Sequence, residues 1–171
     1  HAGALPTAGA LLQFPGGDRL IMGLNVQSTG QAHATVFGRV LAERLGIDRA
    51  HVEHRHGDST LEIPGFASVG SRSAQAASHA LMKSAEVMLA KGKKVAAMLL
   101  QANEAEVAYA SGKFSAGNRD VSLFDVAERA AELARQGVIP ESLDTQGGVK
   151  VPPSFPNGCH IAEVEIDAAT G

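Results

Sequence analysis

Sulfur and aromatic rings are scarce in this sequence. Its 171 residues include one cysteine and one tyrosine but no tryptophan. The single cysteine, Cys159, excludes an intrachain disulfide framework and fits a reducing compartment such as the cytoplasm. With so few rings, the core of this chain must be packed mainly from Val, Leu, Ile, Met and Ala.

Strong charge, long apolar runs and a leader pattern are also missing. The formal net charge of -3 gives no basic stripe for nucleic acid. No apolar run reaches the ~20 residues that a membrane span needs, and the first residues lack a signal-peptide pattern. We therefore predict a cytoplasmic protein that binds no nucleic acid and has no membrane span. Because the chain starts at His1 without Met and stops at Gly171 after an apparent strand, we expect both ends to be cuts through a longer protein.

The period of the apolar residues changes between two and about 3.6 along the chain, which separates strands from helices. Gly46 and Gly137 are predicted helix ends, because glycine accepts the left-handed conformation found there. Gly92 interrupts the longest helix at a cost of ~1 kcal/mol relative to Ala. The predicted elements are a hairpin over 10–26, a helix over 31–45, a strand over 51–56, a helix over 71–102, a hairpin over 107–115, a helix over 122–136, an irregular segment over 137–157 and a strand over 159–167.

The order of these elements indicates the fold class. Hairpins are mixed with helices, and there is no regular alternation of strand and helix that would build a parallel sheet. This order favours an α+β fold, in which a mixed sheet with hairpins packs against helices. A chain of 171 residues corresponds to about one domain, so we expect residues 1–171 to belong to a single domain.

A turn that contains glycine precedes the first predicted helix. Residues 27–31 lead from the end of a strand through Gly30 to Gln31. A helix start of this kind presents free backbone N–H groups and a positive dipole end, which suits a phosphate or an oxo group. Gln31 adds an amide at the mouth of the turn. The alternative is an ordinary capped helix start without a ligand.

A second loop, Gly70–Ser73, opens the long helix in the same way. It combines backbone N–H groups, two hydroxyls and the guanidinium of Arg72, which offers a rigid fork to phosphate or carboxylate. The alternative is an N-cap serine beside a surface arginine. Two such loops in one domain favour a cradle for an anion or a cofactor more than either loop does alone.

The motifs together resemble a known family. In their order and spacing they are similar to the large, molybdopterin-binding subunit of the molybdenum hydroxylases, which include xanthine dehydrogenase, aldehyde oxidase and carbon monoxide dehydrogenase. The Gly-Ser-Arg-Ser form of the second loop most resembles the carbon monoxide dehydrogenase branch. The segments that carry the resemblance are residues 23–35, 45–47, 56–58, 70–73 and 156–171.

The resemblance implies a molybdenum cofactor-binding domain in an oxidoreductase that hydroxylates a substrate carbon with oxygen derived from water. The cofactor would be molybdopterin with molybdenum, as the cytosine dinucleotide in most bacterial members. Iron–sulfur clusters and FAD are expected on other domains or subunits. Gln31 would donate a hydrogen bond to an oxo ligand of the metal. The residues that would hold the cofactor are Gly30, Gln31, Ala32, His33, Gly70, Ser71, Arg72 and Ser73.

Two departures from the family pattern affect the expected function. Ala32 stands where the family usually has Gly. The active-site base of the family is a Glu that lies beyond the last residue of this chain, so we expect the isolated chain to be inactive. The alternative function is a non-catalytic module of the same fold that binds a subunit or a nucleotide phosphate. The sequence does not indicate which substrate the family reaction would use.

Other polar clusters favour simpler interpretations. Of His51, His54 and His56, only the last two would share one face of a strand, and no cysteine or acidic cluster completes a zinc-type set. We predict no metal site there. The basic residues in 91–94 are interpreted as a solvated helix face.

The segment from Cys159 to Asp167 has the alternating pattern of a strand. In that strand Cys159 would be a small buried residue. Glu163, Glu165 and Asp167 would form its exposed face.

Overall fold

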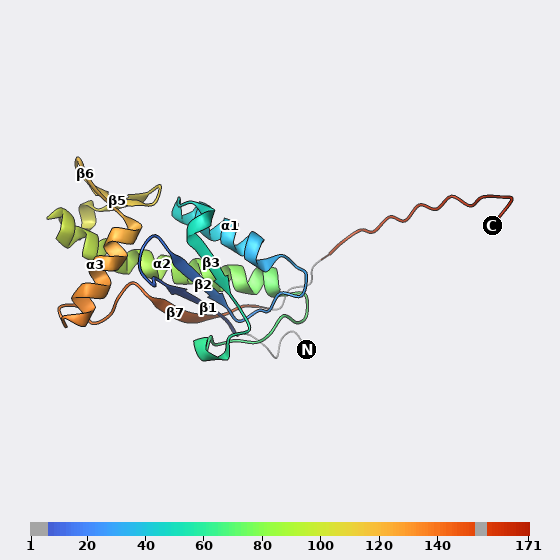
Figure 1. Cartoon of the computed structure of the whole chain (residues 1–171), viewed down its shortest axis with the longest axis horizontal. Coiled ribbons are helices and arrows are strands. Elements are labelled where there is room, and N and C mark those ends of the chain that lie inside the picture. Colours follow the sequence, from blue (N-terminus) through green and yellow to red (C-terminus); the bar gives the residue numbers. More distant parts are fainter. Residues whose placement is uncertain (1–6, 153–156) are drawn as a thin grey trace.

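The computed structural model describes residues 7–152 and 157–171 (Figure 1). These described residues form three α-helices, two β-sheets and three short 3-10 helices. The strands and α-helices are β1 (Thr7–Gln13), β2 (Leu20–Leu24), α1 (His33–Leu45), β3 (Val52–Arg55), α2 (Ser73–Leu100), β4 (Ala108–Ala110), β5 (Lys113–Ala116), β6 (Arg119–Ser122), α3 (Leu123–Arg135) and β7 (Thr145–Lys150).

The larger sheet has the strand order β3-β2-β1-β7. β1 and β2 form the predicted antiparallel hairpin, with Leu12 opposite Met22. After α1, β3 returns parallel to β2, with Leu20 opposite Val52. β7 pairs antiparallel with the other edge of β1. This mixed sheet, packed against helices, is an α+β fold and confirms the predicted class.

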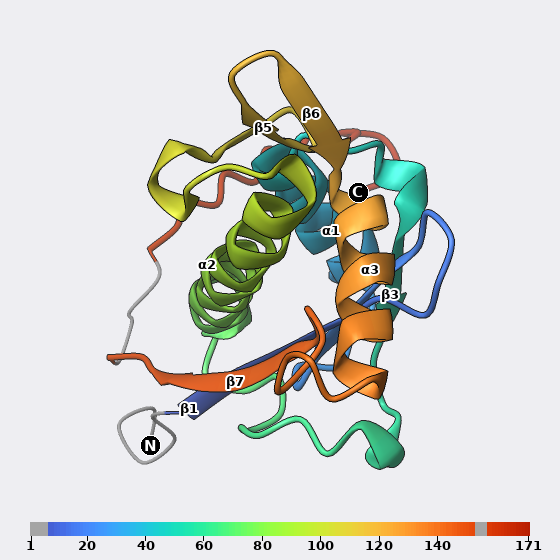
Figure 2. The ribbon, with the colours of Figure 1, turned by 90° about the vertical axis from the view of Figure 1, so that its left-hand side faces the viewer.

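Helix α2 crosses one face of the larger sheet above β1 and β7 (Figures 1 and 2). Its inner surface is made of small residues such as Ala77, Ala80 and Ala85, all of which are buried. Small side chains bring the helix close to the strands, and the Ser84 hydroxyl donates a hydrogen bond to the carbonyl oxygen of Ala10 at 3.3 Å. The core is mainly aliphatic, as the scarcity of aromatic residues predicted, and it includes the rings of Phe37 and Phe114.

The opposite face of the sheet is crossed by the segment that leads to the second predicted ligand loop. This segment lies close to two glycines of the central strands. A Cβ atom on Gly9 would lie 1.9 Å from the carbonyl oxygen of Pro64, and one on Gly23 would lie 2.8 Å from Cδ1 of Ile63. Because only glycine leaves room for Ile63 and Pro64 at these positions, Gly9 and Gly23 allow this segment to lie directly on β1 and β2.

The smaller sheet, β4-β5-β6, packs against α2 together with α3. Helix α3 begins as predicted, because the Ser122 hydroxyl accepts a hydrogen bond from the backbone N–H of Asp125 at 3.1 Å. The Tyr109 hydroxyl donates to the carbonyl oxygen of Leu45 at 2.7 Å and ties this part of the chain to the end of α1. Burial raises the pKa of Tyr109, so the hydroxyl remains a donor.

Two predicted segments were wrong. Residues 137–157 are not irregular throughout, since they contain β7; residues 153–156 of that range lie outside the described part of the chain. Residues 159–167 form no strand, and Cys159 is exposed rather than buried. Figure 1 shows this segment extended and leading away from the sheets. A strand needs a neighbour for its backbone hydrogen bonds, and no described segment lies beside it.

Among the helices of the described residues, none combines the length and apolar content that crossing a bilayer requires.

Candidate functional site

The loop between β2 and α1 presents backbone amides at the start of a helix. Gly30 has φ 105°, and Ala32, the N-cap residue, has φ 58° and ψ 36° in the left-handed region. No side chain caps α1, and its first turn has no acidic residue. The first N–H groups of the helix are therefore left for an external acceptor. Ala32 thus has a backbone conformation that favours Gly.

The orientation of the Gln31 side chain follows from its contacts with Thr29. Its Oε1 accepts hydrogen bonds from the backbone N–H of Thr29 and, at 3.3 Å, from the Thr29 hydroxyl. Because a backbone N–H can only donate, the oxygen must face Thr29. The amide NH2 group makes no hydrogen bond within the described residues, and Gln31 is exposed. Gln31 is thus set up as a hydrogen-bond donor.

The second loop has a similar backbone. Gly70 and Ser71 have φ 61° and 53°, and α2 then begins at Ser73 without a side-chain cap. The N-cap residue is Arg72, not a serine, and it is only 4% exposed. Both parts of the alternative interpretation, an N-cap serine and a surface arginine, were therefore wrong. A buried guanidinium at a helix start makes this end of α2 strongly positive.

Three hydrogen bonds fasten the second loop to the first. The backbone N–H of Ser68 donates to Oε1 of Gln27 at 3.0 Å, and the Ser68 hydroxyl donates to the carbonyl oxygen of Gln27 at 2.7 Å. Two residues earlier in each segment, Nδ2 of Asn25 donates to the carbonyl oxygen of Phe66. Oδ1 of Asn25 accepts from the N–H of Gly9 at 2.9 Å. We call Asn25, Gln27, Phe66 and Ser68 the clasp.

The two loops meet at one cavity of about 600 Å³. Five predicted site residues line it, two from the first loop and three from the second. Gly30 and Ala32 shape the first loop without lining the cavity, and Arg72 lies buried behind the second. The lining residues are Gln31, His33, Val36, Phe37, Ser68, Val69, Gly70, Ser71, Ser73 and Ala74.

Several buried polar atoms around this cavity lack a partner. Within residues 7–152 and 157–171, no hydrogen bond reaches Nδ1 of His33, Nη2 of Arg72 or Oε1 of Gln75. His33 begins α1, and the other two residues lie at the start of α2. Leaving a buried polar group unpaired costs about 1–3 kcal/mol. Nη2 of Arg72 and the two uncapped helix starts are donors that fit an anionic ligand, whereas Oε1 of Gln75 is an acceptor and needs a donor group.

Comparison with known families agrees with this chemistry. The family described as the molybdopterin cofactor-binding domain matches residues 2–171. The chain belongs to this family. A molybdopterin cofactor-binding domain thus accounts for nearly the whole sequence.

Two relatives are similar over most of this molybdopterin cofactor-binding domain. The nicotine 6-hydroxylase large subunit of Paenarthrobacter nicotinovorans is 31% identical over 171 residues, which is 96% of this chain and 21% of that protein. The carbon monoxide dehydrogenase large chain of Hydrogenophaga pseudoflava is 30% identical over 149 residues, covering 83% of this chain and 18% of that one. The chain therefore spans about a fifth of the length of these relatives.

Solved structures share the fold of this domain. Reconstituted CO dehydrogenase from Oligotropha carboxidovorans superimposes with a TM-score of 0.75 at 21% identity, over 86% of this chain and 18% of that one. Quinoline 2-oxidoreductase from Pseudomonas putida 86 gives a TM-score of 0.69 at 18% identity, over 85% of this chain and 19% of that one. At these identities the likeness concerns the fold alone.

The residues at the cavity fit the group for which the domain family is described. Molybdopterin carries a phosphate and a pterin with a polar edge. The amides of two uncapped helix starts and the positive charge of Arg72 suit the phosphate. The Ser71 and Ser73 hydroxyls and the Gln31 amide offer donors to the remaining polar atoms.

A pair of stacked histidines lies on β3 and just after it. The rings of His54 and His56 stack with centroids 5.1 Å apart and planes at 9°, while His51 lies apart from them and contacts the carbonyl oxygen of Asp18 at 2.6 Å. Burial, followed by the charges of His56, His33 and Arg49, lowers the pKa of His54 to about 4. His54 is therefore a neutral, half-buried residue of the domain. The predicted separation of His51 from the other two is confirmed.

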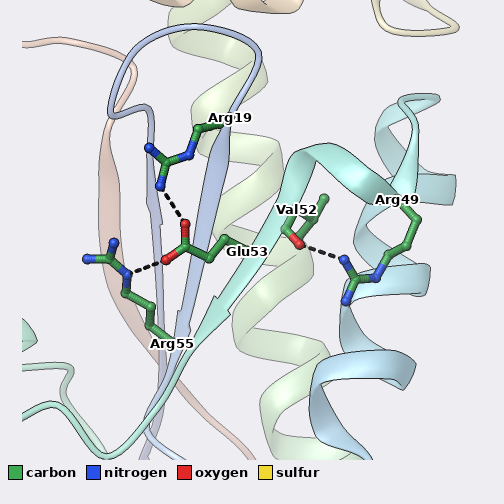
Figure 3. A network of polar contacts seen from close by, with 5 residues as sticks. All are labelled: Arg19, Arg49, Val52, Glu53 and Arg55. Carbon is green, nitrogen blue, oxygen red and sulfur yellow. Dashed lines mark hydrogen bonds and ion pairs between the residues drawn. The ribbon is translucent and has the colours of Figure 1, made fainter.

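The direction of α1, and so of its N-terminal amides, is fixed by Arg49. Nη1 of Arg49 donates to the carbonyl oxygen of Val52 at 2.5 Å (Figure 3), and Nη2 donates to that of Ala34 at 2.7 Å. The guanidinium lies against Gly38, where a Cβ atom would lie 2.5 Å from Nε. One side chain thus joins the beginning of α1 to the beginning of β3.

A small network of ion pairs lies on β3 and immediately before β2. Oε2 of Glu53 lies 2.6 Å from Arg19, and Oε1 lies 2.8 Å from Arg55 (Figure 3). Hydrogen bonds from Arg19 and then Arg55 hold the pKa of Glu53 below its usual value. Because all three side chains are exposed, this network contributes little to stability.

Sequence reasoning missed the clasp and part of the cavity lining. Phe37 follows His33 by four residues and could have been placed on the same helix face. The bonds between Gln27 and Ser68 join residues 41 positions apart, and no local pattern indicates such a pair. The pairing of Gln27 with Ser68 can be recognised only in the tertiary structure, in which the segment after β3 crosses the sheet.

Proposed function

We propose that this domain forms one wall of the cofactor site in the large chain of a molybdenum-dependent hydroxylase. In this proposal the complete protein hydroxylates a substrate carbon with oxygen from water, and the isolated chain is inactive. The observation that carries the proposal is the meeting of two uncapped helix N-termini at one cavity. The family match supports the cofactor, and the relatives named as a hydroxylase and a dehydrogenase support the reaction class.

The second loop would bind the phosphate of the cofactor. Residues Gly70–Ser73 offer backbone N–H groups at the positive end of α2, and both serines add hydroxyl donors. Arg72 would supply charge from behind the loop. A buried guanidinium with an unpaired Nη2 carries an uncompensated charge, which is costly in the absence of an anion. Binding of a phosphate would offset that cost.

The first loop would act on the metal end of the cofactor. When bound, the molybdenum centre would supply the capacity for two-electron oxidation. Gln31 would hold its NH2 group toward an oxo ligand, because Thr29 keeps its oxygen turned away. A donor placed toward developing charge contributes ~3 kcal/mol to catalysis. His33 would add a ring nitrogen at the same helix start.

The remaining parts of the reaction would come from outside this cavity. No carboxylate is among its lining residues in the described chain, so a Glu base would be supplied elsewhere in the complete protein. Iron–sulfur clusters and FAD on other domains or subunits would remove the electrons. The relatives named as large chains or complex subunits support such partners. We further propose the cytosine dinucleotide form of the cofactor and a cytoplasmic location.

The first test is the cofactor content of the complete protein, purified with its partner subunits from a host that makes molybdopterin. We expect about one molybdenum and one molybdopterin per large chain. Absence of both, in a host that loads a control enzyme, would contradict the proposal. A non-catalytic module that binds a subunit or a nucleotide phosphate would then explain the cavity.

The second test addresses Gln31. Gln31→Glu keeps an oxygen for Thr29 but removes the donor group, and Gln31→Ala removes both. We expect both variants to lower kcat by roughly 100- to 1000-fold with unchanged thermal stability. Gln136→Ala, an exposed change at the end of α3, is the control. Wild-type turnover by Gln31→Glu would exclude the donor role.

A further inference from the structure

The clasp is the only set of hydrogen bonds between residues 25–31 and 65–73 within the described chain. Three bonds make the connection, and two of them link Gln27 to Ser68. Asn25 also holds the N–H of Gly9, so the connection reaches back to β1. Hydrogen bonds therefore attach the segment before the second loop to the residues that follow β2.

The second loop has little else to order it. Residues 56–72 contain only one short 3-10 helix between β3 and α2. Side-chain hydrogen bonds of His56 and Gln146 also connect this segment to the rest of the chain: Nδ1 of His56 accepts from the backbone N–H of Ser28 at 3.4 Å, and Nε2 of Gln146 donates to the carbonyl oxygen of Glu62 at 2.9 Å. Ser71 stands in the left-handed region with φ 53°, a conformation that persists in a non-glycine residue only when its surroundings impose it. Among the side-chain hydrogen bonds of residues 56–72, those of Ser68 lie nearest to Ser71 in the sequence.

We propose that Gln27 and Ser68 are positioning residues that hold the two cofactor loops at a fixed separation before the cofactor binds. This rests on the proposed function. Ser68 lines the cavity, and its bonds to Gln27 bring the amides of the second loop toward the same space as Gln31. A cradle that is already ordered loses less conformational freedom on binding, which raises affinity without any new contact to the ligand.

The proposal is tested with Ser68→Ala and Gln27→Ala in the complete protein. Gln146→Ala is the matched control, since it also removes an amide hydrogen bond to the segment between β3 and α2, but at Glu62 and not at the clasp. Ser68→Thr keeps the hydroxyl and serves as the rescue. Two quantities are measured: backbone hydrogen exchange of residues 66–73 in cofactor-depleted protein, and the rate at which loaded protein releases molybdopterin.

We expect both alanine variants to exchange and to release molybdopterin roughly five- to tenfold faster, the size of effect that one net hydrogen bond produces. Gln146→Ala should match wild type in both measurements at residues 66–73, and Ser68→Thr should restore both. Thermal unfolding of each variant reports whether the fold is intact. If Gln27→Ala unfolds, Ser68→Ala and Ser68→Thr are sufficient, because the first removes only one hydroxyl and the second keeps it.

Each other outcome has a distinct meaning. Faster exchange with unchanged molybdopterin release would show that the clasp only orders the loop, and would overturn the positioning role. Unchanged exchange would show that the clasp does not order the loop at all, with the same consequence. Wild-type protein without molybdopterin would overturn the proposed function, and the role of the clasp toward this cofactor with it.

Discussion

The ring of Phe114 occupies the space that a side chain at Gly92 would need. A Cβ atom on Gly92 would lie 2.6 Å from Cζ and 3.1 Å from Cε2 of this fully buried ring. Phe114 belongs to β5, so this contact packs the smaller sheet against the C-terminal half of α2. The glycine that interrupts the longest helix is thus a packing site.

Gly92→Ala is expected to destabilise the chain by about 1–3 kcal/mol, although alanine is the better helix former by ~1 kcal/mol. The added methyl group forces Phe114 out of its place, and this outweighs the gain in helix propensity. Urea unfolding measures the effect. Ala90→Gly, on the exposed side of the same helix, reports the propensity difference alone. An increase in stability for Gly92→Ala would mean that Phe114 moves at no cost.

Ala32→Gly is expected to stabilise the chain by about 1 kcal/mol, because a left-handed backbone is strained for alanine and not for glycine. The φ of 58° at Ala32 places the strain at the N-cap of α1. Ala34→Gly, two residues later and inside the helix, should destabilise the chain by about 1 kcal/mol. Thermal unfolding of both variants is sufficient. Equal destabilisation by both would show that Ala32 is unstrained.

Arg72→Met is expected to separate folding from cofactor binding. In cofactor-free protein, replacing a buried guanidinium with a group of similar volume should leave the free energy of unfolding unchanged or raise it by about 1 kcal/mol. In loaded protein the same change should weaken molybdopterin retention by roughly 10- to 100-fold, because the positive charge that Arg72 supplies to the phosphate-binding loop is lost. Arg135→Met, at the exposed end of α3, is the control. Strong destabilisation without cofactor would indicate a structural role for Arg72.

His54 predicts a pH dependence of stability. Its pKa is about 4 in the folded chain, below the ordinary 6.5, so between these values the unfolded chain binds more protons. Stability should therefore be complete above pH 6.5 and fall as the pH approaches 4. The loss is about 1–2 kcal/mol after allowance for solvent around a half-buried ring. Urea unfolding from pH 7 to 4.5 should show a shallower decline for His54→Gln than for His79→Gln, an exposed control.

The sequence by itself determined the elements that local chemistry specifies. Gly46 ends α1 in the left-handed conformation, and the hydroxyl of Ser122 caps α3, so both helices were predicted from their own residues. The alternation of apolar residues predicted the hairpin of β1 and β2. The two loops with free helix starts were found for the same reason, since glycine and the helix that follows it are neighbours in the chain.

Only the tertiary structure decided which segments become partners. β7 contains Gly147 and Gly148 and has no strand pattern, but it pairs because β1 offers a free edge. Residues 159–167 have the pattern and form no strand, because no described segment offers them an edge. The burial of Arg72 and the bonds of Ser68 depend on a segment that crosses the sheet. Backbone hydrogen bonds and burial require a second surface, which no single segment can specify.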